Sequence, residues 1–158
     1  MTRGAALGND PDALQAPQSP AASAARVLPA DGAPVILLAE DEDSLRGMLD
    51  IVLRGSGYRV LLCANGSQAQ ALLEGDGRID AALFDLRMPE VSGGELLTLL
   101  RGDPRRAHTP AIAMSAYNDD QQAQALLTAG ADAFLAKPFS LQQLTSTLAS
   151  LLGRTPDR

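Results

Sequence analysis

Five short apolar runs, separated by longer stretches with helical spacing, constrain the fold of this chain more than any other feature. Each run is too short for a helix that stands alone, and glycine or proline punctuates the segments between them. The runs span residues 35–39, 59–64, the segment that ends in Asp85, 111–114 and 133–136. They are continuously apolar rather than alternating, which is typical of strands in a parallel sheet covered by helices on both faces.

The stretches between the runs have the apolar spacing of amphipathic helices. In the first, apolar residues recur from Leu45 at i, i+3, i+4, i+7 and i+8, Asp43 or Ser44 can cap its start, and Gly55 ends it. A capping box that begins at Ser140 precedes the last helix. The predicted inward faces of the later helices include Leu72 and Leu73, Leu96 and Leu97, Leu126 and Leu127, and Leu141 with Leu144. Five strands interleaved with five helices predict a doubly wound, flavodoxin-like (βα)5 fold with a parallel sheet in the order 2-1-3-4-5.

Residues 1–33 differ in composition from the rest of the chain. Alanine, proline, glycine, serine and aspartate dominate them, and prolines interrupt every potential helix. We expect a disordered Ala/Pro-rich tail, with a short partner-docked helix over residues 21–28 as the alternative. The remaining length suits one domain, expected over residues 34–154, followed by a short C-terminal tail over 155–158.

Composition argues against several classes of function. The formal net charge of −6 gives little electrostatic support for direct binding to nucleic acid or to an anionic membrane. The apolar runs fall far short of a membrane span, and the N-terminus lacks the pattern of a signal peptide. The single cysteine, Cys63, lies inside an apolar run, which suits a buried thiol in a reducing compartment. We therefore expect a soluble cytoplasmic protein.

Polar side chains follow four of the five predicted strands, at the sheet edge where doubly wound folds bind ligands. They are Glu40 and Asp41 after the first strand, Asp85 at the end of the third, Ser115 after the fourth and Lys137 after the fifth. Taken alone, Asp85 or Ser115 would more often belong to a turn, and four acids after a strand would more often be a solvated loop that caps a helix. Their combination at one edge favours a reactive site.

Carboxylates crowded at one edge repel each other unless a proton or a cation intervenes. Oxygen ligands without paired histidine or cysteine suit a hard ion such as Mg²⁺, with Mn²⁺ as a second candidate. A bound ion would leave Asp85 as a nucleophile towards phosphorus, while the Ser115 hydroxyl and the Lys137 ammonium would contact phosphoryl oxygens. Lys137 is also the only lysine in the chain. These residues predict a phosphoryl-transfer site whose product is an aspartyl phosphate.

From about Pro34 to Arg154 the chain resembles the receiver domain of two-component response regulators. The motifs that carry the resemblance are Glu40-Asp41, the segment 84–89 with Gly93 downstream, Ser115-Ala116 and Lys137-Pro138-Phe139. The resemblance implies that Asp85 is the phosphoacceptor, that Ser115 and Lys137 contact the phosphoryl group, and that the Lys137-Pro138 bond is cis. It further implies that Mg²⁺ is held by Glu40, Asp41, Asp85 and the backbone carbonyl of Arg87.

Further roles are implied by the resemblance alone. Phe134 occupies the position of an aromatic switch that turns inward as Ser115 moves, while Arg87 and Tyr117 occupy positions that modulate dephosphorylation. The implied phosphodonor is a histidine kinase or a histidine phosphotransfer protein, because the sole histidine, His108, lies in a connection. The fourth helix, fifth strand and fifth helix would form the surface that binds a downstream protein, or a second copy of the chain when phosphorylated. The implied function is a phosphorylation-dependent signalling switch in a phosphorelay.

Departures from the family pattern are few: Glu40 replaces a common aspartate, Ser115 a frequent threonine and Phe134 a common tyrosine. A phosphorylation-independent interaction module on the same fold is an alternative, although it would normally have lost Asp85, an acidic partner or Lys137. A metal-dependent phosphatase would need a second aspartate where Arg87 stands. Phe134 fits a core aromatic as well as a switch. Whether the chain counts as an enzyme stays open, because it would catalyse only its own phosphorylation and dephosphorylation.

Overall fold

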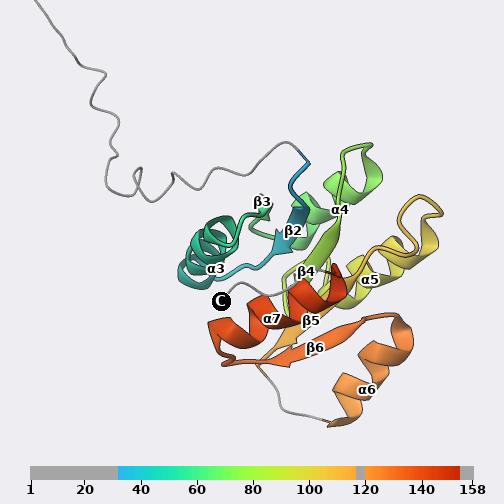
Figure 1. Ribbon diagram of the computed structural model, residues 1–158. Helices are drawn as coiled ribbons and strands as arrows, with labels where there is room; N and C mark the ends of the chain where they lie inside the picture. Colours follow the sequence, from blue (N-terminus) through green and yellow to red (C-terminus); the bar gives the residue numbers. More distant parts are fainter. Residues whose placement is uncertain (1–31, 117–119, 154–158) are drawn as a thin grey trace, which may run out of the picture.

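The computed structural model describes residues 32–116 and 120–153, in which strands and helices alternate along the chain (Figure 1). The elements are β2 (Val35–Ala39), α3 (Asp43–Gly55), β3 (Arg59–Cys63), α4 (Gly66–Glu74), β4 (Ala81–Asp85), α5 (Gly93–Gly102), β5 (Ala111–Ser115), α6 (Asp120–Ala129), β6 (Ala133–Ala136) and α7 (Leu141–Leu151). None of the helices in these ranges is long and apolar enough to cross a membrane. The predicted tails lie outside the described residues, apart from Gly32 and Ala33 at the entry to β2.

The five strands form one parallel sheet in the order β3-β2-β4-β5-β6. This order confirms the predicted 2-1-3-4-5 topology, in which the chain starts near the middle and winds outwards in both directions. Every residue of β2, β4 and β5 is buried, as expected for strands covered on both faces. In the edge strand β3 only Val60 and Cys63 are buried, because part of this strand faces solvent.

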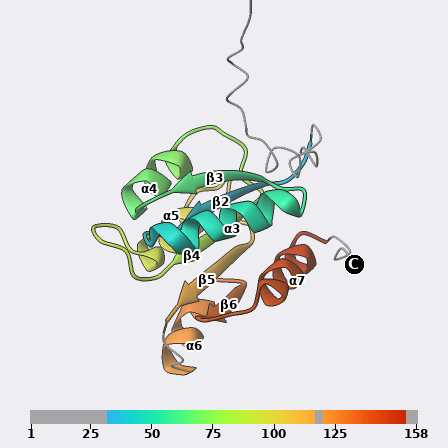
Figure 2. The same ribbon diagram turned by 90° about the vertical axis from the view of Figure 1, so that its left-hand side faces the viewer.

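Helices cover both faces of the sheet and enclose two separate cores (Figure 2). On one face, residues of α3 and α7 such as Leu49 and Leu148 pack with Ile36 and Leu83 from the sheet. On the other face, α4, α5 and α6 contribute residues that include Leu97 to a core with the alternate residues of the same strands. Burial on both faces fixes the central strands, so the residues at their carboxyl ends have well-defined positions.

Several local predictions were wrong at the ends or faces of elements. Helix α3 starts after Glu42, which occupies the N-cap position and makes no capping hydrogen bond with its side chain, so neither Asp43 nor Ser44 is the N-cap. The predicted strand 59–64 ends at Cys63, while the predicted strand 111–114 continues to Ser115. Leu72, Leu127 and Leu141 were assigned to buried faces but are partly exposed at the helix margins. The Ser140 capping box is confirmed, and a second box begins at Ser92.

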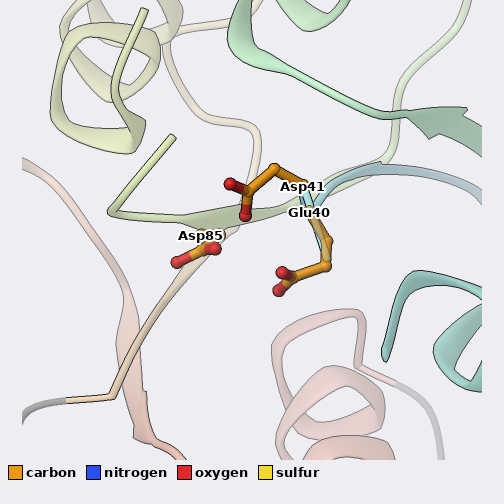
Figure 3. A group of neighbouring side chains, drawn as sticks. All are labelled: Glu40, Asp41 and Asp85. Carbon is orange, nitrogen blue, oxygen red and sulfur yellow. The ribbon is translucent and has the colours of Figure 1, made fainter. Parts of the chain in front are cut away.

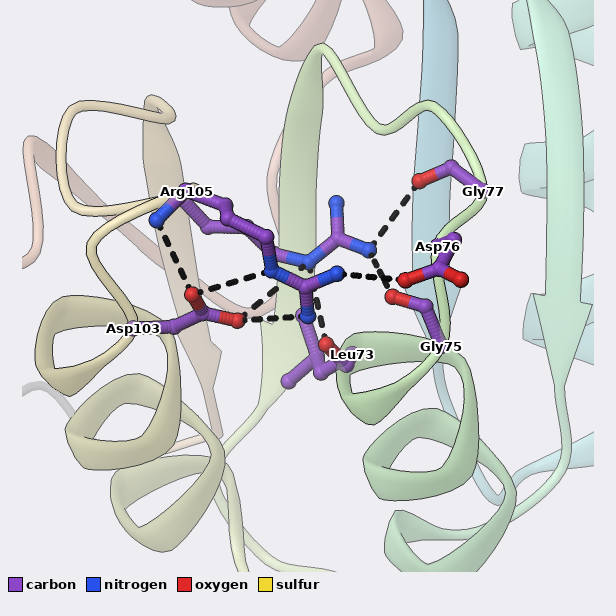
Figure 4. A network of polar contacts seen from close by, with 7 residues as sticks. Leu73, Gly75, Asp76, Gly77, Asp103 and Arg105 are labelled. Carbon is purple, nitrogen blue, oxygen red and sulfur yellow. Dashed lines mark hydrogen bonds and ion pairs between the residues drawn. The ribbon is translucent and has the colours of Figure 1, made fainter.

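A buried arginine holds the helix-to-strand connections at the edge of the sheet opposite the strand carboxyl ends. Arg106 is 6% exposed and donates hydrogen bonds to the carbonyls of Leu73, Gly75 and Gly77 at the end of α4 and beyond (Figure 4). These bonds satisfy carbonyls that the helix terminus leaves without intrahelical partners. The neighbouring Arg105 contacts carboxylates on the surface instead.

Candidate functional site

The parallel register brings the acidic residues of two central strands together. Ala39 of β2 pairs with Phe84 of β4, so the next residues along the two strands, Glu40 and Asp85, lie side by side at the carboxyl edge. Asp41 follows at the same edge, and the three carboxylates gather there (Figure 3). One carboxylate oxygen from each of Glu40, Asp41 and Asp85 lies within 4.8 Å of the other two. The predicted acidic cluster therefore forms, with Asp41 exposed and the other two buried.

Glu40 is the most enclosed member of the cluster, with a relative exposure of 0%. Its Oε2 accepts a hydrogen bond of 3.0 Å from the backbone N–H of Glu42, and its Oε1 lies 2.8 Å from Lys137 Nζ. The backbone of Glu40 is held as well, because its N–H donates to the carbonyl of Cys63 and its carbonyl accepts from Arg46. Burial of this carboxylate is possible because each oxygen has a donor.

Asp85 is 4% exposed, and its pKa is raised from an ordinary value of 3.8 to about 6. Desolvation is the largest cause, and the nearby Glu40 charge acts in the same direction. The backbone N–H of Arg87, which donates to Asp85 Oδ1 over 3.2 Å, and the Lys137 charge oppose the rise. The two buried carboxylates of Glu40 and Asp85 thus face one ammonium group, that of Lys137.

Lys137 follows β6 and projects between the two buried carboxylates. Its Nζ is 2.8 Å from Glu40 Oε1 and 3.4 Å from Asp85 Oδ2, and its backbone N–H donates to the carbonyl of Ser115 over 2.6 Å. Burial lowers the pKa of Lys137, but the hydrogen bond to Glu40 and the two carboxylate charges outweigh it and raise that pKa overall. The Lys137-Pro138 peptide bond is cis, as the resemblance implied.

The remaining predicted site residues occupy different surroundings. Ser115 is fully buried at the end of β5, and Arg87 is exposed just beyond Asp85. Phe134 is partly buried in β6 and packs against the core on the α4, α5 and α6 face, which agrees with its reading as a core aromatic. Its role as a switch stays a prediction. Tyr117 lies outside the described residues.

The chemistry of the cluster fits a hard divalent cation. Three carboxylates face one ammonium group, and among the described residues no histidine or cysteine belongs to the group. Burial of Asp85 and the nearby Glu40 charge both raise the pKa of the Asp85 carboxyl, which a cation bound beside it would oppose. Oxygen-only ligands with excess negative charge and an exposed member that leaves room for water match the preferences of Mg²⁺.

An apolar pocket of about 500 Å³ borders the cluster between the start of α3 and the segment after β6. It is lined by Glu42, Leu45, Met48, Ala116, Lys137, Pro138 and Phe139. Ile51, one turn further along α3 than Met48, is 72% exposed. We call Leu45, Met48 and Ile51 the α3 apolar patch; Leu45 and Met48 line the pocket beside the acidic cluster.

Two features of the site were missed by the sequence analysis. Glu40 is a closer partner of Lys137 than Asp85 is, although the pair is separated by 97 positions and has no local signal. Arg46 holds the carbonyl of Glu40 and also pairs with Asp43, and this role had a weak signal in the i,i+3 spacing of the two charges.

The family model described as the response regulator receiver domain matches residues 36–149 of the chain. The transcriptional activator protein PfeR of Pseudomonas aeruginosa is 41% identical over 77% of this chain and 38% of its own length. The polar-differentiation response regulator DivK of Brucella anthropi is 30% identical over 75% of this chain and 95% of its own length. The chain thus spans half or less of the first two curated relatives but nearly all of DivK.

Solved structures resemble the chain over the same region. The receiver domain of the sensor histidine kinase PA1611 from Pseudomonas aeruginosa, solved with a magnesium ion coordinated in its active site cleft, matches with a TM-score of 0.68 and 34% identity. That match covers 77% of this chain and 98% of the PA1611 domain. The chemotaxis response regulator CheY4 of Vibrio cholerae matches with a TM-score of 0.70 and 28% identity, over 75% and 98% of the two chains.

Proposed function

The chain belongs to the response regulator receiver domain family, and from this premise we propose that it is a phosphorylation-dependent switch with Asp85 as the phosphoacceptor. The observation that carries the proposal is the buried Asp85 carboxylate at the end of β4, within reach of Lys137 and of the Glu40 and Asp41 carboxylates. This arrangement supplies a nucleophile, a cation that can approach a phosphoryl group, and oxygen ligands for a metal.

In the proposed reaction, a phosphohistidine on a partner protein donates its phosphoryl group to Asp85. A carboxylate oxygen of Asp85 forms a bond to phosphorus as the bond between phosphorus and the histidine nitrogen breaks, and the imidazole leaves with that electron pair. A bound Mg²⁺ would neutralise charge on the phosphoryl oxygens, and Glu40, Asp41, Asp85 and the Arg87 carbonyl would hold it. Water later cleaves the acyl phosphate and regenerates the carboxylate.

The residues around Asp85 have separate proposed roles. The Lys137 ammonium pairs with Glu40 and Asp85 before transfer and turns towards a phosphoryl oxygen afterwards. The Ser115 hydroxyl at the end of β5 contacts a second phosphoryl oxygen. The side chains of Arg87 and Tyr117 modulate the attack of water and thereby the lifetime of the phosphorylated state.

Phosphorylation would act on a partner surface through a shift of population. The added charge and oxygens favour the state in which Ser115 and Phe134 move inward. Because Phe134 belongs to β6, this movement changes the face formed by α6, β6 and α7. We expect a downstream protein, or a second copy of the chain, to bind that face in the cytoplasm.

The α3 apolar patch is the proposed docking surface for the histidine-bearing donor. The patch borders the reactive edge, so a partner helix laid across it would bring a phosphohistidine to Asp85. Two alternatives have less support. An interaction module has no need for the retained carboxylates and Lys137, and a phosphatase lacks its general acid at Arg87.

Incubation with Mg²⁺ and a small phosphodonor such as acetyl phosphate tests the proposal, with intact mass as the measurement. We expect the wild type to gain one phosphoryl group and Asp85→Asn to gain none. Asp76→Asn, which removes a carboxylate at the opposite edge of the sheet, is the matched control and should behave as the wild type. Phosphorylation of Asp85→Asn to the same extent as the wild type would contradict the assignment of Asp85 as the acceptor.

A further inference from the structure

The loop of residues 86–92 determines how the Asp85 carboxylate is presented. Leu86 and Met88 bury their side chains in the core, and the backbone N–H of Leu86 donates to Met114 while its carbonyl accepts from Gly93. Between these anchors, the N–H of Arg87 donates to Asp85 Oδ1 over 3.2 Å. The path of the loop therefore fixes the position of a donor that orients the carboxylate.

A glycine on a different element allows the loop to follow this path. Gly66, the first residue of α4, is buried against the backbone of Val91. A Cβ atom on Gly66 would lie 1.9 Å from the carbonyl oxygen of Val91 and 2.7 Å from its carbonyl carbon and Cβ. The obstacle is backbone rather than a flexible side chain, so any larger residue at position 66 must displace either the helix or the loop.

A second contact joins the same two segments. Ser67 Oγ donates to Glu90 Oε1 over 3.0 Å, and Glu90 has a φ of 69°, in the left-handed region that non-glycine residues rarely adopt. A residue in that conformation persists when its surroundings hold it there. The start of α4 thus holds the loop at two successive residues, Glu90 and Val91.

We propose that Gly66 is a positioning residue for the phosphoacceptor, which acts by letting α4 fix the loop whose Arg87 amide orients the Asp85 carboxylate. The inference rests on the proposed function only for the identity of the acceptor. The geometric part concerns the loop and the metal-binding carboxylates, and it applies to the protein before any phosphorylation.

The test compares Gly66→Ala with Gly94→Ala, because both glycines lie in the first turn of a helix next to the loop. A methyl group at position 94 would meet only Ser92 Oγ, at 3.8 Å. We expect Gly66→Ala to weaken Mg²⁺ binding in calorimetric titration by about tenfold or more, as changes behind metal ligands commonly do. It should also shift the Arg87 amide resonance of the metal-free protein. Gly94→Ala should leave both observables near those of the wild type.

Stability alone would not produce this result, because both measurements are made well below the unfolding temperature of each folded variant. If Gly66→Ala is folded and leaves the Arg87 amide and the Mg²⁺ affinity unchanged, the proposal is overturned. If Gly66→Ala does not fold, the same two measurements are made on Ser67→Ala. This variant removes the hydrogen bond from Ser67 to Glu90 and adds no atoms. A shifted Arg87 amide with weaker Mg²⁺ binding supports the proposal, and unchanged values overturn it. Failure of the wild type to accept a phosphoryl group would instead defeat the proposed function.

Discussion

For single residues, the central feature of the site is a pair of buried carboxylates beside one partly buried ammonium group. Glu40 and Asp85 share the ammonium of Lys137, whose Nζ is closer to Glu40. Burial removes Asp85 from water, and the neighbouring Glu40 charge acts in the same direction, so the pKa of Asp85 rises to about 6. Perturbed carboxylate pKa values are common at functional sites, which agrees with the proposed role of Asp85.

Asp85→Asn should stabilise the metal-free protein at pH 7.5. The folded-state pKa of about 6 exceeds the ordinary 3.8, so protonated Asp85 favours the folded state, and that contribution is lost as pH rises from about 3.8 through about 6. Above that window the ionised carboxylate opposes folding, and its removal should increase the free energy of unfolding by on the order of 2 kcal/mol. Urea denaturation at pH 7.5 and pH 4 measures this. A stabilisation as large at pH 4 would contradict the charge argument.

Lys137→Ala should make the protein more dependent on Mg²⁺. The substitution leaves the buried Glu40 and Asp85 carboxylates without their ammonium partner, and a bound divalent cation would replace part of the lost charge. We expect a lower unfolding temperature without metal and a larger rise on addition of Mg²⁺ than in the wild type. Thermal unfolding followed by circular dichroism measures both, with Lys137→Arg as the charge-preserving control. An unchanged response to Mg²⁺ would argue against a metal beside Lys137.

At the level of elements, α3 buries one face in the core and leaves apolar residues exposed on another. Leu49 and Leu53 bury one face in the core, while Met48 and Ile51 leave an apolar strip exposed beside the reactive edge. Exposed apolar residues that cluster next to a reactive site often mark a surface for a partner. Arg46 of α3 donates to the carbonyl of Glu40 at the end of β2, and this bond ties the proposed docking surface to the acidic cluster.

Ile51→Glu should separate the two ways of phosphorylating Asp85. The side chain is 72% exposed, so the charge should leave folding unaffected, but it opposes the approach of an apolar partner surface. With a histidine phosphotransfer protein that phosphorylates the wild type, we expect transfer to slow by about tenfold, which corresponds to about 1.4 kcal/mol. Phosphorylation by acetyl phosphate should not change. Leu72→Glu, at an exposed position on α4, is the matched control. An equal loss with both donors would contradict a docking role.

In the whole molecule, the residues of the candidate site lie at the carboxyl ends of the strands, and the contacts of Arg106 that stabilise the fold lie at the opposite ends. The carboxyl edge holds the acidic cluster and Lys137, and the opposite edge holds the Arg106 contacts with the end of α4 (Figure 4). Parallel strands produce this division, because all five carboxyl ends meet at one edge and all helix-to-strand connections meet at the other. Substitutions at the second edge should therefore change stability without changing metal binding.

Arg106→Met should lower the free energy of unfolding by about 2 to 4 kcal/mol, because it leaves three carbonyls of the α4 end without their donor. Arg105→Met removes ion pairs that are exposed to solvent and should change stability by less than about 1 kcal/mol. Mg²⁺ affinity at the acidic cluster should stay the same in both variants. If folded Arg106→Met bound Mg²⁺ more weakly than the wild type, the two edges of the sheet would be coupled.

The order of the strands and the membership of the acidic cluster could be predicted because local signals were strong. The apolar runs marked the strands. The polar residues of the site stood at the end of a run or within two residues beyond it: Glu40, Asp41, Asp85, Ser115 and Lys137. The exposed sides of Leu72, Leu127 and Leu141 could not be predicted, since helix periodicity alone does not say how far a neighbouring helix extends over each margin. The N-cap of α3 was missed because Glu42 takes that position with backbone geometry alone.

The parallel sheet, its topology and the set of residues at its carboxyl edge could be predicted from the sequence, because periodicity and strand-end position are local properties of the chain. Three features became visible only in the folded molecule: Lys137 lies closer to Glu40 than to Asp85, the pKa of Asp85 is raised, and Gly66 of α4 contacts the loop behind Asp85. Each of these depends on distances between segments far apart in the sequence. Burial and close backbone packing set those distances, and no local pattern encodes them.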